Sequence, residues 1–144
     1  MRRILVAAGG ALVLMLAGCS NEAGPKPGRP APDPGPEALQ VKLDALAVDP
    51  CFVAPEKQKP KGCEKYVTQL ANTALTARKL AGTRNPGLAA QADQLDKAVA
   101  TYRDKGCNAA EDPGTAPCGP ALTDMSAALR AIKASLRQSQ ATTG

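Results

Sequence analysis

The chain has 144 residues, and its 18 basic and 13 acidic side chains give a formal charge of +5. A charge this mild does not indicate nucleic-acid binding, and the absence of histidine removes the usual base of nucleophilic catalysis. The length allows one small domain with unstructured ends. Because the chain has no tryptophan, two tyrosines and one phenylalanine, its core must consist of leucine, valine, isoleucine and many alanines.

The first 18 residues have the three-part layout of a secretory signal. Two arginines give a positive start, and an apolar run over residues 4–17 ends in small residues before Cys19. This run is shorter than the roughly 20 apolar residues that a membrane-spanning helix needs. The segment Leu-Ala-Gly-Cys at residues 16–19 resembles the lipobox of bacterial lipoprotein precursors.

The resemblance to lipoprotein precursors implies that residues 1–18 are a signal peptide that is cut away and that Cys19 is lipidated. Cys19 would then anchor the mature protein, through acyl chains such as palmitate, to the outer face of the bacterial cell membrane. This extracytoplasmic chain would carry a formal charge of +3, because two of the 18 basic residues leave with the signal and 16 face 13 acids. The alternative is an ordinary secreted protein in which Cys19 is an unpaired thiol.

A proline-rich segment follows the candidate anchor. Residues 23–36 contain six prolines and three glycines, a composition that builds no core. We expect residues 19–36 to form an extended tether between the membrane and the domain. The domain itself is expected over residues 37–138, and the polar residues 139–144 are expected to be a disordered tail.

Apolar residues recur at helical spacing in four stretches of the domain, at residues 36–49, 63–81, 86–105 and 120–137. Prolines at the start of the first, third and fourth stretches suit the first turn of a helix. Glycines follow the second and third stretches, where they favour helix termination. The fourth stretch keeps an unbroken 3-4-3-4 spacing of large apolar side chains, which favours helix packing at shallow angles. The sequence therefore predicts four amphipathic helices.

Four cysteines remain once Cys19 is assigned to lipid, and an even number in an exported chain indicates disulfides. They are Cys51, Cys63, Cys107 and Cys118. Each half of the domain has the order helix, cysteine, loop, cysteine, helix, with a proline-bearing loop of about a dozen residues. This plan predicts an all-α domain: a small, disulfide-stapled, antiparallel four-helix bundle made of two similar helical hairpins.

Disulfides within each half, Cys51 with Cys63 and Cys107 with Cys118, fit this plan best. Because all four cysteines gather at one end of such a bundle, crossed pairings stay open. A zinc site is another use of four cysteines, but no two of them have the close Cys-x-x-Cys spacing. We expect neither a metal nor a cofactor.

The loop between the first two cysteines is basic. Its candidate contact residues are Lys57, Lys59, Lys61 and, just beyond the loop, Lys65. Such a cluster could bind anionic lipid, a wall polymer or an acidic protein of the envelope. The alternative is an ordinary solvated loop.

The first predicted helix is shorter than the others by about 8 to 10 Å, at 1.5 Å per residue. The shortfall predicts a partly uncovered apolar groove near the tether end of the bundle. The candidate lining residues are Ala77, Leu80, Leu88, Ile132 and Leu136. Such a groove could take a lipid, a small hydrophobic molecule or a partner helix, unless the tether or a tilted packing closes it.

Acidic residues supply two further candidates. Asp93 and Asp96 lie three residues apart on the third helix and could form an acid–base pair. Their position beside the apolar stripe favours instead a solvated face, with Lys97 as the ionic partner of Asp93. Three acidic residues near the second loop could hold calcium, but they lack the oxygen spacing and central glycine of a calcium loop. These are Asp104, Glu111 and Asp112.

Together these features predict a non-catalytic, membrane-anchored interaction module of the bacterial envelope, which contacts another envelope component through its loops or surface. The alternative is a carrier or sensor of a small apolar ligand or lipid that occupies the groove. An enzyme ranks below both, because the sequence contains no recognisable catalytic constellation.

Overall fold

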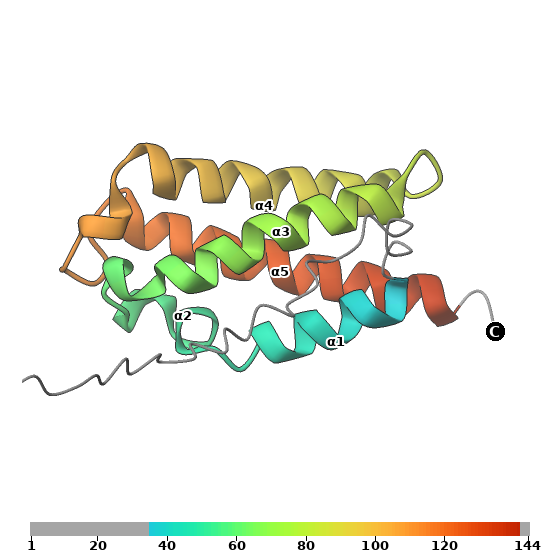
Figure 1. The fold of residues 1–144 in the computed structure, drawn as a ribbon, viewed down its shortest axis with the longest axis horizontal. Coiled ribbons are helices and arrows are strands. Elements are labelled where there is room, and N and C mark those ends of the chain that lie inside the picture. The colour runs from blue at the N-terminus through green and yellow to red at the C-terminus, as the bar shows by residue number, and fades with distance from the viewer. Residues whose placement is uncertain (1–34, 142–144) are drawn as a thin grey trace, which may run out of the picture. The chain divides into compact units, whose positions relative to one another are not determined.

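The computed structural model describes residues 35–141, which form an all-helical domain with no strand in that range (Figure 1). The helical class predicted from the sequence is confirmed. Residues 1–34 and 142–144 lie outside the described residues, and with them the signal peptide, Cys19 and nearly all of the predicted tether. Among the helices of the described part, none has the length and apolar character that crossing a membrane requires.

The described residues form five α-helices and three short 3-10 turns. The α-helices are α1 Pro36–Leu46, α2 Pro50–Val53, α3 Glu64–Ala81, α4 Pro86–Asp104 and α5 Cys118–Ala141. The 3-10 turns are η1 Pro55–Lys57, η2 Pro60–Cys63 and η3 Cys107–Ala109.

Local sequence explains where these helices begin and end. Proline occupies the first turn of α1, α2 and α4, where its missing N–H leaves no hydrogen bond unmade. The Asn85 side chain accepts a hydrogen bond of 3.0 Å from the Leu88 amide at the start of α4. The Asp49 carboxylate accepts one of 2.8 Å from the Cys51 amide at the start of α2. After α3, Gly82 adopts a positive φ of 49°, which ends the helix.

The four long helices bury one apolar stripe each. α4 packs against α3 and α5, and α1 packs against α3 and α5 (Figure 1). The stripes meet in one core of aliphatic side chains and alanines. Among the fully buried side chains are Leu39 and Leu43 of α1, Leu70 and Ala74 of α3, Leu95 and Val99 of α4, and Leu122, Met125, Leu129 and Ile132 of α5.

Both disulfides lie within a half of the domain, so the pairing that the sequence favoured is confirmed. Cys51 is bonded to Cys63, with an S–S distance of 2.04 Å and a Cα–Cα distance of 5.9 Å. Cys107 is bonded to Cys118, with corresponding distances of 2.00 Å and 5.4 Å. The first bond connects α2 to the turn that precedes α3, and the second connects η3 to the first residue of α5. Each bond therefore fixes the loop between two long helices.

Three predicted boundaries are wrong. α1 ends at Leu46, and a separate short helix starts at Pro50 because the Asp49 side chain caps it. α5 starts at Cys118 rather than at residue 120, and it continues to Ala141. The predicted disordered tail therefore begins inside a helix, where the Asn85 side chain donates a hydrogen bond of 3.2 Å to the Ser139 hydroxyl.

Replacing Cys107 and Cys118 together by alanine should lower the free energy of unfolding by about 3 kcal/mol, because the unfolded chain loses a loop constraint. Urea unfolding of the double variant against the parent measures the loss. Peptide mapping without reduction supplies the control: the Cys51–Cys63 bond should remain. Two free thiols at Cys51 and Cys63 in this variant would contradict the pairing.

Candidate interaction surface

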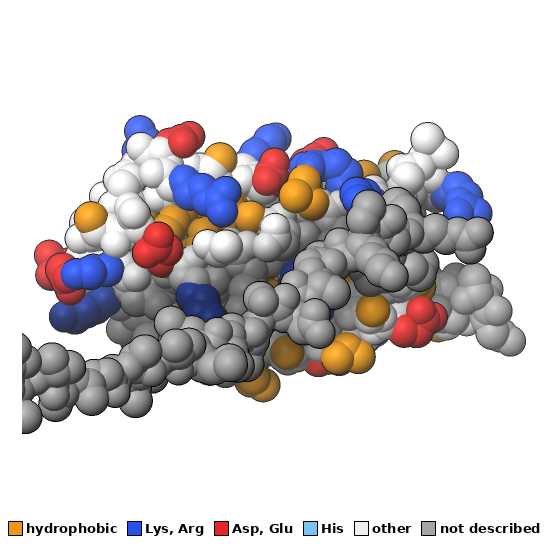
Figure 2. All heavy atoms as spheres, in the orientation of Figure 1, with side chains coloured by type: hydrophobic (Ala, Val, Ile, Leu, Met, Phe, Trp, Pro, Cys, Tyr) orange, Lys and Arg blue, Asp and Glu red, His pale blue; other side chains and the backbone are white. Residues whose placement is uncertain are grey.

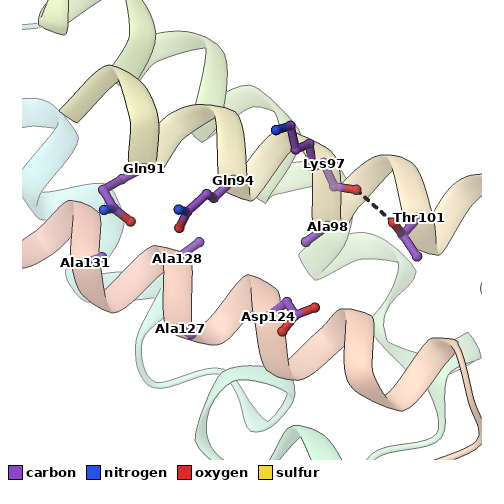
Figure 3. A pocket seen from close by; sticks show the side chains of 9 residues that line it. All are labelled: Gln91, Gln94, Lys97, Ala98, Thr101, Asp124, Ala127, Ala128 and Ala131. Carbon is purple, nitrogen blue, oxygen red and sulfur yellow. Dashed lines mark hydrogen bonds between the residues drawn. The ribbon is translucent and has the colours of Figure 1, made fainter. Parts of the chain in front are cut away.

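A groove runs along the surface between α4 and α5 (Figure 3). It is open to solvent and has a volume of about 540 Å³. Four alanines line it, which we call the floor, together with five polar residues, which we call the rim. The floor residues are Ala98 of α4 and Ala127, Ala128 and Ala131 of α5; the rim residues are Gln91, Gln94, Lys97 and Thr101 of α4 and Asp124 of α5.

The groove follows from the placement of alanine in the two helices. Ala98 and Ala128 are buried where α4 meets α5, while Ala127 is exposed and Ala131 is half-buried. The small methyl side chains let the backbones of α4 and α5 come close together. They leave the space between the two helices unfilled at the protein surface. The floor can therefore receive a ridge of side chains from another helix, as in the ridges-into-grooves packing of helices.

The rim offers both hydrogen-bond donors and acceptors. Figure 3 shows the Gln91 and Gln94 side chains extending from α4 toward α5, and Asp124 rising from α5. The Thr101 hydroxyl is already engaged, since it donates a hydrogen bond of 3.0 Å to the Lys97 carbonyl. The amides, the ammonium and the carboxylate of the rim can pair with polar side chains of a partner, and the rim carries one charge of each sign.

The predicted lysine cluster lies in the first inter-cysteine loop and at the start of α3, with all four side chains exposed. Two of them contact Glu111 in the second loop: the Nζ atoms of Lys59 and Lys61 lie 3.4 Å and 2.9 Å from its carboxylate. The hydrogen bond from Lys61 lowers the pKa of Glu111. Because these pairs are exposed, they contribute little stability. Glu111 balances part of the basic charge, and binding by the cluster Lys57, Lys59, Lys61 and Lys65 stays a prediction.

The apolar groove expected at the tether end is not open. Its candidate residues Ala77, Leu88, Ile132 and Leu136 are each at most 3% exposed, and Leu80 is partly buried against the same core. The carrier hypothesis therefore loses the observation on which it depended.

The position of α1 explains why that groove is closed. The Asp44 carboxylate of α1 lies 2.8 Å from Lys133 Nζ of α5, so α1 covers the second half of α5. The part of α5 that α1 is too short to cover lies at the opposite end, beside the disulfides. There α2 and η1 pack against α5. At this end the Arg130 guanidinium lies over the Phe52 ring of α2, with its Cζ atom 4.6 Å from the ring centroid.

The carboxylates that could have formed an acid–base pair are held by a cation. Asp93 and Asp96 lie 2.7 Å and 3.5 Å from the Arg78 guanidinium of α3. Arg78, and not the predicted Lys97, is thus the ionic partner that the structure gives Asp93. Within residues 35–141 no three aspartate, glutamate or cysteine side chains come together as potential metal ligands.

The two tyrosines have buried hydroxyl groups. The Tyr102 hydroxyl donates a hydrogen bond of 2.7 Å to the Pro60 carbonyl. The Tyr66 hydroxyl is buried beside the Ser126 hydroxyl, which donates a hydrogen bond of 3.1 Å to the Leu122 carbonyl. Burial, and then the charge of Asp49, raises the pKa of Tyr66. Burial also raises the pKa of Tyr102. Both hydroxyls therefore stay protonated at neutral pH.

No protein-family model, curated protein or solved structure matches this chain.

Replacing Ala128 by leucine should destabilise the domain by about 1 to 3 kcal/mol, because the larger side chain cannot fit between α4 and α5. Ala127→Leu is the matched control: its side chain is exposed, and its effect should stay within about 0.5 kcal/mol. Urea unfolding at one pH compares the two variants. Equal losses of stability would contradict the described arrangement of the groove floor.

Proposed function

We propose that the chain is a lipid-anchored lipoprotein of the bacterial envelope, held on the outer face of the cell membrane through Cys19. We propose further that its helical domain binds another envelope protein and catalyses no reaction. The lipobox-like segment at residues 16–19 supports the anchor. The two disulfides support an oxidising, extracytoplasmic compartment, because such bonds are rare in reducing ones.

In this proposal the domain is one antiparallel bundle of two stapled helical hairpins. The first hairpin joins α1 to α3 through α2 and the Cys51–Cys63 bond, and the second joins α4 to α5 through the Cys107–Cys118 bond. The packing of both α1 and α4 against α3 and α5 supports this arrangement. Such a bundle has four places at its surface where two neighbouring helices meet, and a partner can dock at any of them.

The observation that carries the binding proposal is the groove between α4 and α5. An alanine floor of this kind accepts the side chains of a partner helix, and the polar rim can fix its register through hydrogen bonds. Its mixed rim suits a protein surface better than an apolar ligand, which would leave Gln91, Gln94 and Asp124 without polar partners. The partner class is therefore an envelope protein that presents a helix.

The anchor is tested with the full-length chain expressed in a bacterium that processes lipoproteins. With a clickable palmitate analogue in the medium, the parent chain should become labelled, lose residues 1–18 and sediment with membranes. Cys19→Ala should remain unlabelled and keep its signal, because lipidation precedes cleavage in lipoprotein processing. An unlabelled parent chain cut at another residue would overturn the anchor and leave an ordinary secreted protein.

The binding surface is tested by photo-crosslinking in intact cells. A benzophenone amino acid at position 127, on the groove floor, should give one discrete adduct whose partner is identified by mass spectrometry. The same amino acid at position 75 is the control, because Leu75 is 53% exposed on α3 and does not line the groove. With that partner purified, Ala127→Arg should weaken binding at least tenfold and Leu75→Arg should not. Equal effects of the two variants would overturn the proposed surface.

A further inference from the structure

α1 carries a second apolar stripe on the side that faces away from the core. Its inner stripe, Leu39, Leu43 and Leu46, is buried. Its outer stripe recurs at intervals of three and four residues and is exposed. The outer stripe consists of Ala38, Val41 and Ala45 of α1 and Val48 in the turn that follows.

The valines of the outer stripe are unusually open to solvent. Val41 is 70% exposed and Val48 is 77% exposed. Figure 2 shows hydrophobic side chains at the surface along the position of α1, at the lower edge of the view. What sets these valines apart from the other exposed apolar side chains is that, with Ala38 and Ala45, they form a continuous stripe, which is available for a contact outside the domain.

Charge beside the outer stripe is balanced within the domain. The Asp44 carboxylate accepts hydrogen bonds from Lys133 Nζ at 2.8 Å and from the Gln40 amide at 3.1 Å. The hydrogen bond from Lys133 lowers the pKa of Asp44. Of the other charged side chains of α1, Glu37 and Lys42 are of opposite sign. The charges of α1 and Lys133 therefore cancel, and Asp49, next to Val48, is the acidic residue beyond them; its carboxylate accepts a hydrogen bond from the Cys51 amide.

We propose that the outer stripe of α1 rests on the surface of the lipid bilayer to which Cys19 is anchored. This inference depends on the proposed function, because it needs the lipid anchor. α1 is the first described helix after Cys19, and the 17 residue-to-residue steps from Cys19 to Pro36 can span at most about 60 Å when fully extended. The tether thus keeps α1 close to the bilayer at a high effective concentration, and a weak apolar contact becomes populated.

The size of the outer stripe favours a bilayer over a second protein. The stripe offers two valines and two alanines with no polar rim, whereas the groove between α4 and α5 has nine lining residues, five of them polar, that can fix a protein partner. A short apolar helix face beside a lipid anchor needs no such rim, since the anchor already supplies the affinity. α1 and α4 both pack against α3 and α5 and lie on opposite edges in Figure 1. A bilayer under α1 would therefore leave α4 facing away from the membrane.

The chain contains no tryptophan, so a single introduced indole reports its own surroundings. The test uses the full-length, processed and lipidated protein in phosphatidylcholine–phosphatidylglycerol vesicles, with and without brominated acyl chains. In the Val48→Trp variant, emission should shift to the blue and brominated lipid should quench at least half of it. Val41→Trp is a second reporter on the same stripe and should behave alike.

Leu75→Trp is the matched control, because Leu75 is also an exposed apolar side chain but lies on α3. Its emission should be unchanged by brominated lipid. Quenching equal to that of the stripe variants, or no quenching in any variant, would overturn the inference. A blue shift without quenching that grows with protein concentration would also overturn it, in favour of a second copy of the chain.

Flotation separates this inference from the proposed function. Protein that floats with vesicles and shows a lipidated Cys19 by mass spectrometry, but whose stripe reporters are not quenched, overturns the bilayer contact alone. Protein that neither floats nor carries lipid overturns the anchor, and the bilayer contact with it.

Discussion

Two disulfide bonds hold the loops of a domain whose core is built from small and medium aliphatic side chains. Many core positions on α3, α4 and α5 are alanines, such as Ala74, Ala92 and Ala128, and each removes less apolar area from water than a leucine would. The disulfides offset the smaller hydrophobic stabilisation of such a core. They lower the entropy of the unfolded chain, whereas larger side chains would add contacts to the folded one. The helices can therefore remain rich in alanine, and the alanine floor between α4 and α5 follows from the same composition.

The short α1 determines which surfaces the domain exposes. The ion pair between Asp44 and Lys133 places α1 beside the second half of α5. The first half of α5 is covered instead by α2 and η1. A single helix of full length would have had no break in which to place Cys51 against the start of α3. The break at residues 47–49 also leaves Val48 exposed, next to the outer face of α1.

The sequence predicted the features that follow from the spacing of residues along one helix. It missed those that depend on how far one helix is shifted along its neighbour. The inward leucines of α1 and the 3-4-3-4 stripe of α5 were predicted from spacing, and cysteine order favoured the pairing that the structure has. The spacing predicted a first helix up to residue 49, whereas the Asp49 side chain caps a separate helix, α2, that starts at Pro50. Spacing left open whether the groove at the tether end is closed, because spacing along one helix does not say how far that helix is shifted against its neighbour.

The candidate surfaces were missed for a related reason. Ala127, Ala128 and Ala131 count as apolar in a search for core stripes, but their small size is what leaves the hollow beside α4. Val41 and Val48 lie opposite the leucines of α1, and a search for the buried face passes over them. Glu111 was considered only as a calcium ligand, and nothing in its local sequence indicates that it lies beside lysines some fifty residues earlier in the chain.

The two inter-cysteine loops are joined by a backbone hydrogen bond of 3.0 Å from the Lys61 amide to the Ala110 carbonyl. The Tyr102 hydroxyl of α4 adds a link between that helix and the first loop, because it donates to the Pro60 carbonyl. The first loop therefore cannot separate from the second loop and from α4 without breaking these bonds. In terms of hydrogen exchange, the Lys61 amide becomes accessible to solvent only when the loops separate, so its exchange rate reports the opening of this end of the domain as one cooperative unit.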